Sequence, residues 1–154
     1  MDDTATHAVR HAGPHAGPDA DAVPSAVPGR RVCVISAWTT DYLPGYLTGP
    51  VNERWARRHG YDWRADVLAP DEMRAAIGPE RDHGTWYKVL MINQLLGDGG
   101  PAYSHVVWLD ADACVVDPTG TIDRFIVASG DRDLVVAEDM TPVCKVNCGV
   151  LIIK

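Results

Sequence analysis

The sequence predicts an α/β fold built on a largely parallel sheet, within the single domain that 154 residues allow. Val106–Leu109 is a run of four apolar residues, two of them β-branched, which is typical of a strand buried on both faces. Similar runs alternate along the chain with segments of helical periodicity. This alternation predicts parallel strands joined by helical crossovers.

The first half of the folded region is predicted to contain two strands on either side of a helix. Arg31–Ala37 is an apolar run that predicts a strand, and the loop after it carries Trp38 and Tyr42. These two aromatic residues either cover the base of a ligand or cap the core. Pro50–His59 begins with proline and is followed by glycine, which predicts a helix. Tyr61–Val67 alternates aromatic and polar side chains, which predicts a second strand.

The second half continues the alternation of helices and strands. A polar connection follows, with a short helix expected over residues 71–77. Thr85 is placed to cap a helix that ends near Leu96, with Val89, Ile92 and Leu96 on one face. The remaining predicted elements are a helix over Ile122–Ser129, between Thr121 as its cap and Gly130 as its stop, and strands over Asp133–Ala137 and Val146–Lys154.

Residues 1–29 are predicted to form a tail outside the folded domain, which would span residues 30–154. The segment is rich in Ala, Pro, Gly, Asp and His and has no aromatic residue. It cannot bury enough apolar surface to offset the entropy of ordering it. His7, His11 and His15 would form a metal-binding row on a helix, but Pro14 disfavours that helix. We therefore expect a disordered, low-complexity tail.

Composition excludes several classes of partner. The formal net charge of −7 argues against a nucleic-acid partner, which requires a basic surface, but is compatible with binding a nucleotide. The sequence has no secretory signal and no apolar run long enough to cross a membrane. Its four cysteines, Cys33, Cys114, Cys144 and Cys148, are scattered, and we expect buried or partly buried thiols in a reducing cytoplasm.

Asp110 and Asp112 follow the Val106–Leu109 run directly and are one residue apart. Side chains alternate along extended backbone, so both carboxylates can project to the same side. Two like charges held close are relieved by a raised pKa or by a bound cation. Ligands of open α/β sheets also bind at the carboxyl ends of strands. The pair is therefore either a metal site or two solvated turn acids, since Asp117-Pro118 follows.

Lys88 falls in the first turn of its predicted helix, where the helix dipole disfavours a cation. One interpretation is that the lysine meets an anion. The alternative is a side chain that extends to solvent.

Four stretches occur in the order found in one family. They are Asn52 to Asp62, which ends in His-Gly-Tyr-Asp; Trp86-Tyr87-Lys88-Val89; Val107-Trp108-Leu109-Asp110-Ala111-Asp112-Ala113; and Asn147-Cys148-Gly149-Val150-Leu151-Ile152. Together they resemble the retaining glycosyltransferases of the galactosyl/mannosyltransferase and xyloglucan xylosyltransferase group. Glycogenin-like enzymes share the Lys, Asp-x-Asp and Asn-x-Gly elements more loosely. The resemblance runs from about Val32 to the last residue.

The resemblance implies a nucleotide-sugar binding domain of the GT-A type and a metal-dependent transfer of a hexose or pentose with retention of anomeric configuration. Asp110 and Asp112 would hold Mn²⁺ or Mg²⁺. Lys88 would contact the nucleotide-sugar donor, and Asn147 and Gly149 would line the pocket of the transferred sugar. The second substrate would be a glycan or small-molecule acceptor. No covalent nucleophile is identified, and Glu138 and Asp139 are candidates for contacts with sugar hydroxyls.

Relatives in this family continue beyond the point that corresponds to Lys154, so the resemblance implies the N-terminal, donor-binding half of a C-terminally truncated domain. One alternative is a non-catalytic nucleotide-sugar binding remnant, or a module completed by a second chain that pairs with an unpaired final strand. The other is a phosphatase of the haloacid dehalogenase type. There Asp110 would be the nucleophile and Asp112 the acid/base, although Ala113-Cys114 replaces the usual Gly-Thr.

Overall fold

The computed structural model describes residues 29–81, 83–97, 103–130, 132–141 and 144–154. All of the predicted tail except Gly29 lies outside these ranges. In the described residues the chain forms β1 (Val32–Thr39), α1 (Leu43–Arg58), β2 (Asp62–Leu68), α2 (Pro70–Ile77), the short 3₁₀ helix η1 (Gly84–Trp86), α3 (Tyr87–Leu96), β3 (His105–Leu109), α4 (Ile122–Ala128), β4 (Leu134–Glu138) and β5 (Val146–Ile153).

The strands form one five-stranded sheet in the order β2-β1-β3-β5-β4. The β1 strand pairs in parallel with β2 and β3, whereas β5 runs antiparallel to both β3 and β4. Four strands therefore point the same way, and the sheet is mostly parallel, as predicted. The β5 strand is reversed because residues 139–145 are too few for the crossover of about a dozen residues that a parallel connection needs.

The final strand is not the edge that the sequence suggested. β5 lies between β3 and β4, and both of its sides are paired, while β2 and β4 form the two edges. Its central position follows from the register, in which Val107 and Val135 both face Ile152. The last strand of the chain is therefore not a free edge that seeks a partner.

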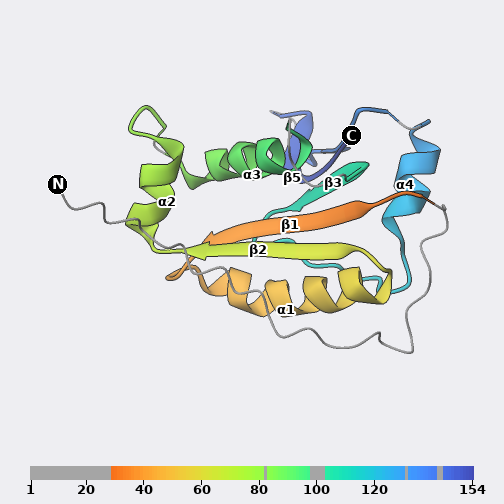
Figure 1. Ribbon diagram of the computed structural model, residues 1–154, viewed down its shortest axis with the longest axis horizontal. Helices are drawn as coiled ribbons and strands as arrows, with labels where there is room; N and C mark the ends of the chain where they lie inside the picture. The colour runs from red at the N-terminus through yellow and green to blue at the C-terminus, as the bar shows by residue number, and fades with distance from the viewer. Residues whose placement is uncertain (1–28, 82, 98–102, 131, 142–143) are drawn as a thin grey trace.

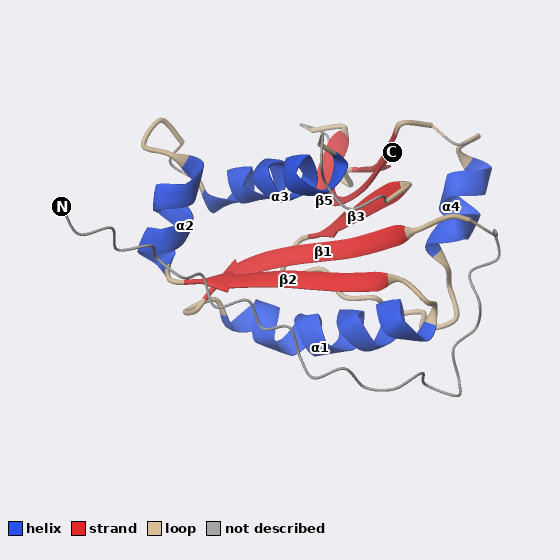
Figure 2. Cartoon of the chain, in the orientation of Figure 1, coloured by secondary structure: helices blue, strands red, loops and turns tan. Residues whose placement is uncertain are grey.

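Helices cover both faces of the sheet, with α1 on one side and α2 and α3 on the other (Figures 1 and 2). Each strand supplies both faces because side chains alternate along it. In β1, Val32 and Val34 pack with α1 and α4, whereas Cys33 and Ile35 pack with α2 and α3. This double coverage explains why the central strands read as continuous apolar runs.

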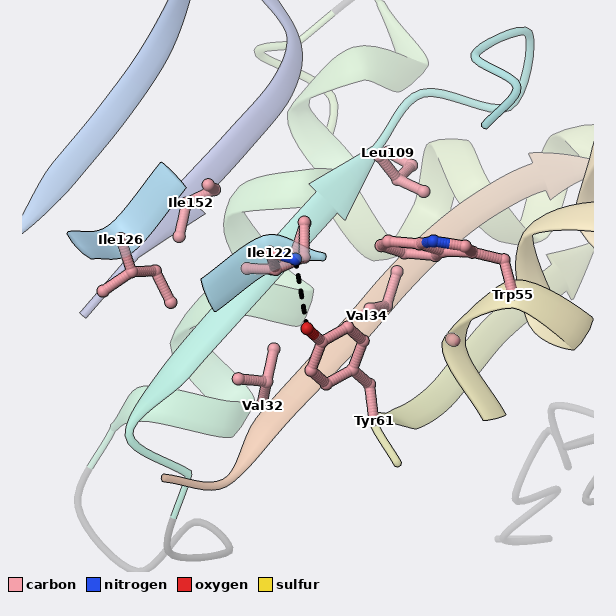
Figure 3. Close-up of a cluster of buried hydrophobic side chains, with 10 residues drawn as sticks. Val32, Val34, Trp55, Tyr61, Leu109, Ile122, Ile126 and Ile152 are labelled. Atoms are coloured by element: carbon pink, nitrogen blue, oxygen red, sulfur yellow. Dashed lines mark hydrogen bonds between the residues drawn. The ribbon is translucent and has the colours of Figure 1, made fainter. Parts of the chain in front are cut away.

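Tyr61 organises the core cluster on the α1 side (Figure 3). Its hydroxyl donates to Asp123 Oδ2 at 2.8 Å and accepts the backbone N–H of Ile122 at 3.0 Å. Burial, together with the bond to Asp123, raises the pKa of Tyr61 to about 12. Thr121 is the N-cap residue of α4, as predicted, but its side chain makes no cap bond. The Tyr61 hydroxyl satisfies the first N–H of the helix instead.

The α1 helix begins at Leu43, well before the predicted start at Pro50. Trp38 lies in β1 rather than in a loop, is buried, and packs against α1. A Cβ on Gly45 would stand 2.3 Å from the Trp38 ring, and one on Gly49 would stand 2.8 Å from it. Two glycines one helical turn apart thus let the helix lie directly on the indole. This packing outweighs the low helix propensity of glycine and proline.

The α3 helix also differs from its prediction. The 3₁₀ turn η1 precedes it, so that α3 starts at Tyr87, and its N-cap residue makes no side-chain bond. The buried face includes Lys88, Met91 and Leu95, whereas Val89 is 50% exposed. The predicted face through Val89 was therefore wrong by one position along the helix.

Within the described residues no helix is long and apolar enough to cross a membrane. The four cysteines are unpaired, and only Cys33 is buried. Cys114, Cys144 and Cys148 are exposed, against the expectation of buried or partly buried thiols, because they lie in loops or at the end of β5 that projects past β3.

Candidate functional site

A pocket of about 430 Å³ opens beside the first turn of α3, where β3 ends and β5 passes it. Among the residues that the structure describes, it is lined by Thr85, Trp86, Lys88, Val89, Asp110, Asp139, Val146, Asn147, Cys148 and Gly149. Four of the five site residues predicted from the sequence line this pocket. They come from α3, from the residue that follows β3, and from β5, and the antiparallel pairing of β5 with β3 places the start of β5 beside the end of β3.

Lys88 is a buried cation whose ammonium group is enclosed by acceptors. Nζ donates to Asp110 Oδ1 at 3.0 Å and to the carbonyl oxygen of Cys148 at 2.9 Å. It also lies 5.3 Å from the centre of the Trp108 ring, within range of a cation–π contact. Of the two alternatives left open by the sequence, the lysine meets an anion. These contacts compensate for its unfavourable place at the start of the helix.

Asp110 is fixed by its neighbours on both sides. The Trp108 indole N–H donates to Oδ1 at 2.5 Å, so this oxygen accepts two hydrogen bonds. The backbone N–H of Asp110 donates to the carbonyl of Gly149 at 2.7 Å, and its carbonyl accepts the N–H of Ala113 at 2.9 Å. The carboxylate is therefore held at the end of β3, with Oδ2 on the side of Gly149.

Asp112 is exposed and does not line the pocket. Its Oδ2 accepts a long hydrogen bond of 3.4 Å from the hydroxyl of Tyr42. The negative charge of Asp112, with a smaller contribution from Asp110, raises the pKa of the Tyr42 hydroxyl. The negative charges of both aspartates therefore reach the Tyr42 hydroxyl. Tyr42 is 40% exposed and joins this pair rather than the core.

The polar end of β5 owes its shape to an irregularity in the sheet. β4 pairs Val136 with Leu151 but Ala137 with Asn147, so residues 148–150 bulge away from β4. Bulges of this kind often redirect groups beside a functional site. Here the bulge turns the carbonyl of Cys148 toward Lys88.

Asn147 and Gly149 interlock beside the Asp110 carboxylate. Asn147 Oδ1 accepts the N–H of Gly149 at 2.8 Å, and its Nδ2 donates to Asp139 Oδ2 at 3.5 Å. A Cβ at Gly149 would lie 2.9 Å from Asn147 Oδ1 and 3.3 Å from Asp110 Oδ2. Hydrogen bonds from the backbone and side chain of Thr141 lower the pKa of Asp139, which keeps it ionised as an acceptor. A larger residue at 149 would therefore displace the Asn147 amide, the Asp110 carboxylate or both.

Sequence reasoning missed the apolar wall of the pocket. Trp86 is 49% exposed, lines the pocket, and has the Arg81 guanidinium 5.6 Å from its ring centre. Val89 and Val146 extend this wall. Trp86 is part of the Trp86-Tyr87-Lys88-Val89 motif, but the spacing of apolar residues along the sequence does not distinguish a residue that lines a pocket from one in the core.

No protein-family model matches the sequence, and no curated protein matches it. Among solved structures, the chain is similar to the crystal structure of a glycosyltransferase involved in the glycosylation of the major capsid of PBCV-1, with a TM-score of 0.61 and 17% sequence identity. The match covers 80% of this chain and 59% of that one, so this chain spans less than two thirds of that structure. At this identity the likeness shows the fold alone: the mixed α/β fold of this chain is similar to that of a glycosyltransferase structure.

Proposed function

We propose that this chain binds a nucleotide-sugar donor with Mn²⁺ or Mg²⁺ and serves glycosyl transfer to a glycan or small-molecule acceptor. The observation that carries the proposal is the meeting of Lys88, Asp110, Asn147 and Gly149 in one pocket. The likeness of the fold to a glycosyltransferase structure supports it. The sequence resemblance further suggests the GT-A type, and transfer with retention.

The residues at the end of β3 suit a hard divalent cation. No group of three or more metal-binding side chains occurs in the part of the chain described. Mg²⁺ and Mn²⁺ in nucleotide sites commonly use only one or two carboxylates, with substrate phosphates and water completing the shell. Asp110 and Asp112 supply two carboxylates, and no other described residue donates a hydrogen bond to Oδ2 of Asp110 or to Oδ1 of Asp112. The donor set therefore fits such an ion, with Asp110 and Asp112 as its ligands.

In glycosyl transfer the bond between the anomeric carbon and the diphosphate oxygen breaks, and its electron pair stays on the diphosphate. A bond forms between the same carbon and the oxygen of an acceptor hydroxyl, whose proton passes to the released diphosphate or to water. The bound cation would stabilise the charge that grows on the leaving diphosphate. Lys88 provides a second positive charge on the same side of the pocket, already oriented by its three neighbours. Preorganised charge of this kind is usually the largest catalytic contribution.

The sugar of the donor would occupy the 430 Å³ pocket. Its polar wall carries Asp139 and Asn147, which can accept and donate hydrogen bonds to hydroxyl groups. Its lining also includes the exposed ring of Trp86. A pyranose or furanose has hydroxyl groups at its edge and C–H groups on its faces, so it matches a pocket lined by both polar and aromatic side chains.

The binding step is tested by thermal unfolding with Mn²⁺ and a panel of nucleoside diphosphates. At a ligand concentration of about one hundred times the dissociation constant, the folded state should gain about 2.7 kcal/mol. Asp112→Asn should abolish this gain and leave the free protein as stable or more stable, because a like-charge repulsion is removed. Asp71→Asn is the matched control, since it removes one exposed acid that neither lines the pocket nor contacts the two aspartates. A melting temperature that no nucleoside diphosphate moves would refute the donor site.

Turnover is tested separately, by following the hydrolysis of nucleotide sugars and the transfer to sugar acceptors. The anomeric configuration of the product, read by NMR, decides between retention and inversion. Binding without hydrolysis or transfer would favour the non-catalytic alternative.

A further inference from the structure

The segment that carries Asp112 is irregular, yet it is held by hydrogen bonds from a single face of α1. Residues 111–120 contain no helix or strand. Side chains of three α1 residues and of the C-cap residue donate hydrogen bonds to carbonyl groups of this segment. Thr48 Oγ1 donates to Ala111 at 2.5 Å, and Asn52 Nδ2 donates to Ala113 at 2.8 Å. Trp55 Nε1 donates to Gly120 at 2.9 Å, and His59 Nε2 donates to Pro118 at 2.9 Å.

The spacing of these side chains places them along one stripe of the helix. Positions 48, 52, 55 and 59 are three or four residues apart, which is the interval of neighbours on a helix surface. The helix can approach this closely because Gly45 and Gly49 leave room for the Trp38 ring beneath it. The α1 helix thus presents a row of polar groups to a loop that contains no helix or strand.

Asn52 is the most constrained member of the row. It is 1% exposed, and besides its bond to Ala113 its Oδ1 accepts the backbone N–H of Val115 at 2.9 Å. An amide buried without partners is costly, whereas here both ends are satisfied. The two bonds fix the peptide groups on either side of residue 114, immediately after Asp112.

Thr48 acts on the residue between the two aspartates. Its hydroxyl proton can go to the carbonyl of Pro44 at 3.0 Å or to that of Ala111 at 2.5 Å, and the shorter contact is across to the loop. With the 2.9 Å turn bond from Ala113 N–H to the Asp110 carbonyl, the backbone is held at the residue before Asp112 and at the residue after it. The direction of an exposed carboxylate is set by the backbone that carries it.

We propose that Thr48 and Asn52 are positioning residues, which hold the 111–113 backbone so that Asp110 and Asp112 together form the divalent-cation site. This inference rests on the proposed function. Trp55 and His59 bond further along the loop, at Gly120 and Pro118, and serve its stability without orienting the acids.

The test compares Mn²⁺ affinity with fold stability in matched variants. Thr48→Val keeps the branched shape of the side chain and replaces the hydroxyl by a methyl group. Asn52→Leu removes both hydrogen bonds to the loop. Thr48→Ser keeps the hydroxyl and removes the methyl group. Trp55→Phe is the control, because it removes a bond from the same helix to the far end of the same loop. The free Mn²⁺ signal in electron paramagnetic resonance gives the affinity of the metal alone, and thermal unfolding gives stability.

Thr48→Val and Asn52→Leu should weaken Mn²⁺ binding about tenfold, the usual loss when a residue that orients a metal ligand is removed. Thr48→Ser should bind as the unaltered protein does. Trp55→Phe should lower the melting temperature without changing Mn²⁺ affinity. If Asn52→Leu does not fold, the isosteric Thr48→Val still decides the matter.

Equal Mn²⁺ affinity in Thr48→Val and the unaltered protein would overturn the inference, as would an equal loss in Trp55→Phe. A protein that binds Mn²⁺ but no nucleoside diphosphate would instead refute the proposed function, and leave the comparison of variants valid. A protein that binds Mn²⁺ neither alone nor in the presence of a nucleoside diphosphate would overturn both.

Discussion

Lys88 Nζ and Asp110 Oδ1 are 3.0 Å apart in the lining of the pocket, with 11% of the lysine side chain and 32% of the aspartate side chain exposed. The lysine thus neutralises one of the two carboxylates that would hold a cation. A metal ion drawn to Asp110 adds a second positive charge beside Nζ. A bound diphosphate carries enough negative charge for both. The geometry therefore favours binding of the metal and the nucleotide together over binding of the metal alone.

Substitution of Lys88 by Met tests this coupling because it should change the two affinities in opposite directions. The affinity for Mn²⁺ alone should rise, since the ammonium group no longer competes for Asp110. The affinity for the nucleoside diphosphate in saturating Mn²⁺ should fall about ten- to a hundredfold, the equivalent of one charge-assisted hydrogen bond of about 1.5–3 kcal/mol. Calorimetric titration measures both values, and Lys88→Arg controls for charge. A parallel loss of both affinities would indicate a structural role for the lysine.

The same lysine explains a failure of the sequence prediction. The buried face of α3 includes Lys88, Met91 and Leu95, but a lysine at a core position looks like the polar side of a helix. The alternative face through Val89 therefore gave the better pattern, although Val89 is half exposed. A lysine can be buried only where other groups compensate its charge. Here those groups are Asp110 and the Cys148 carbonyl, which lie far from Lys88 in the sequence, so the local pattern of the helix does not reveal them.

The strands and the position of Asp110 and Asp112 could be predicted from the sequence because both depend on short, local patterns of residues. A buried strand followed at once by Asp110 and Asp112 places acids at the mouth of a sheet wherever the strand lies. The start of α1 was not accessible, because Gly45 and Gly49 favour a helix only when Trp38 fills the space beside them. The reversal of β5, the bulge over residues 148–150 and the bonds from Thr48 and Asn52 likewise follow from tertiary contacts.

Gly149→Ala should damage the pocket without unfolding the protein. The added Cβ would stand 2.9 Å from Asn147 Oδ1, closer than Cβ atoms normally come to other atoms, and 3.3 Å from Asp110 Oδ2. One or both side chains must move, and the hydrogen bond from Gly149 N–H to Asn147 is strained. We expect weaker binding of Mn²⁺ with a nucleoside diphosphate and a small change in melting temperature. Gly130→Ala is the control, because it strains a positive φ of 69° where nothing lies within 4 Å of the added Cβ. If Gly149→Ala bound Mn²⁺ and the nucleoside diphosphate as the unaltered protein does, Gly149 would not be part of the binding site.

Trp86→Ala should affect the sugar and spare the nucleotide. If a sugar ring covers about 50 Å² of the indole, burial at about 25 cal/mol per Å² contributes about 1.3 kcal/mol, close to tenfold in affinity. The affinity for the nucleotide sugar should therefore fall about tenfold, while that for the nucleoside diphosphate stays the same. The Arg81 guanidinium packs against the same ring, so Arg81→Ala is the control that shows how far a change in the position of the indole alone lowers the affinity for the nucleotide sugar. If Trp86→Ala lowered the affinities for the nucleotide sugar and for the nucleoside diphosphate equally, the sugar would not bind against the Trp86 ring.

Tyr61→Phe tests the core rather than the pocket. The change removes the donor to Asp123 and the acceptor for Ile122 N–H, and it should lower the free energy of unfolding by about 1–3 kcal/mol at neutral pH. Because the pKa of Tyr61 is raised from 10 to about 12, the unfolded chain loses this proton first as the pH rises. The contribution is complete below pH 10 and is lost as the pH approaches 12. Urea denaturation between pH 8 and pH 12 should therefore show the variant and the unaltered protein converging. Cys33, whose pKa is raised by burial to about 11, is present in both proteins and cancels in the difference. A stability difference that stays constant over this range would show that the phenol titrates at its ordinary pKa.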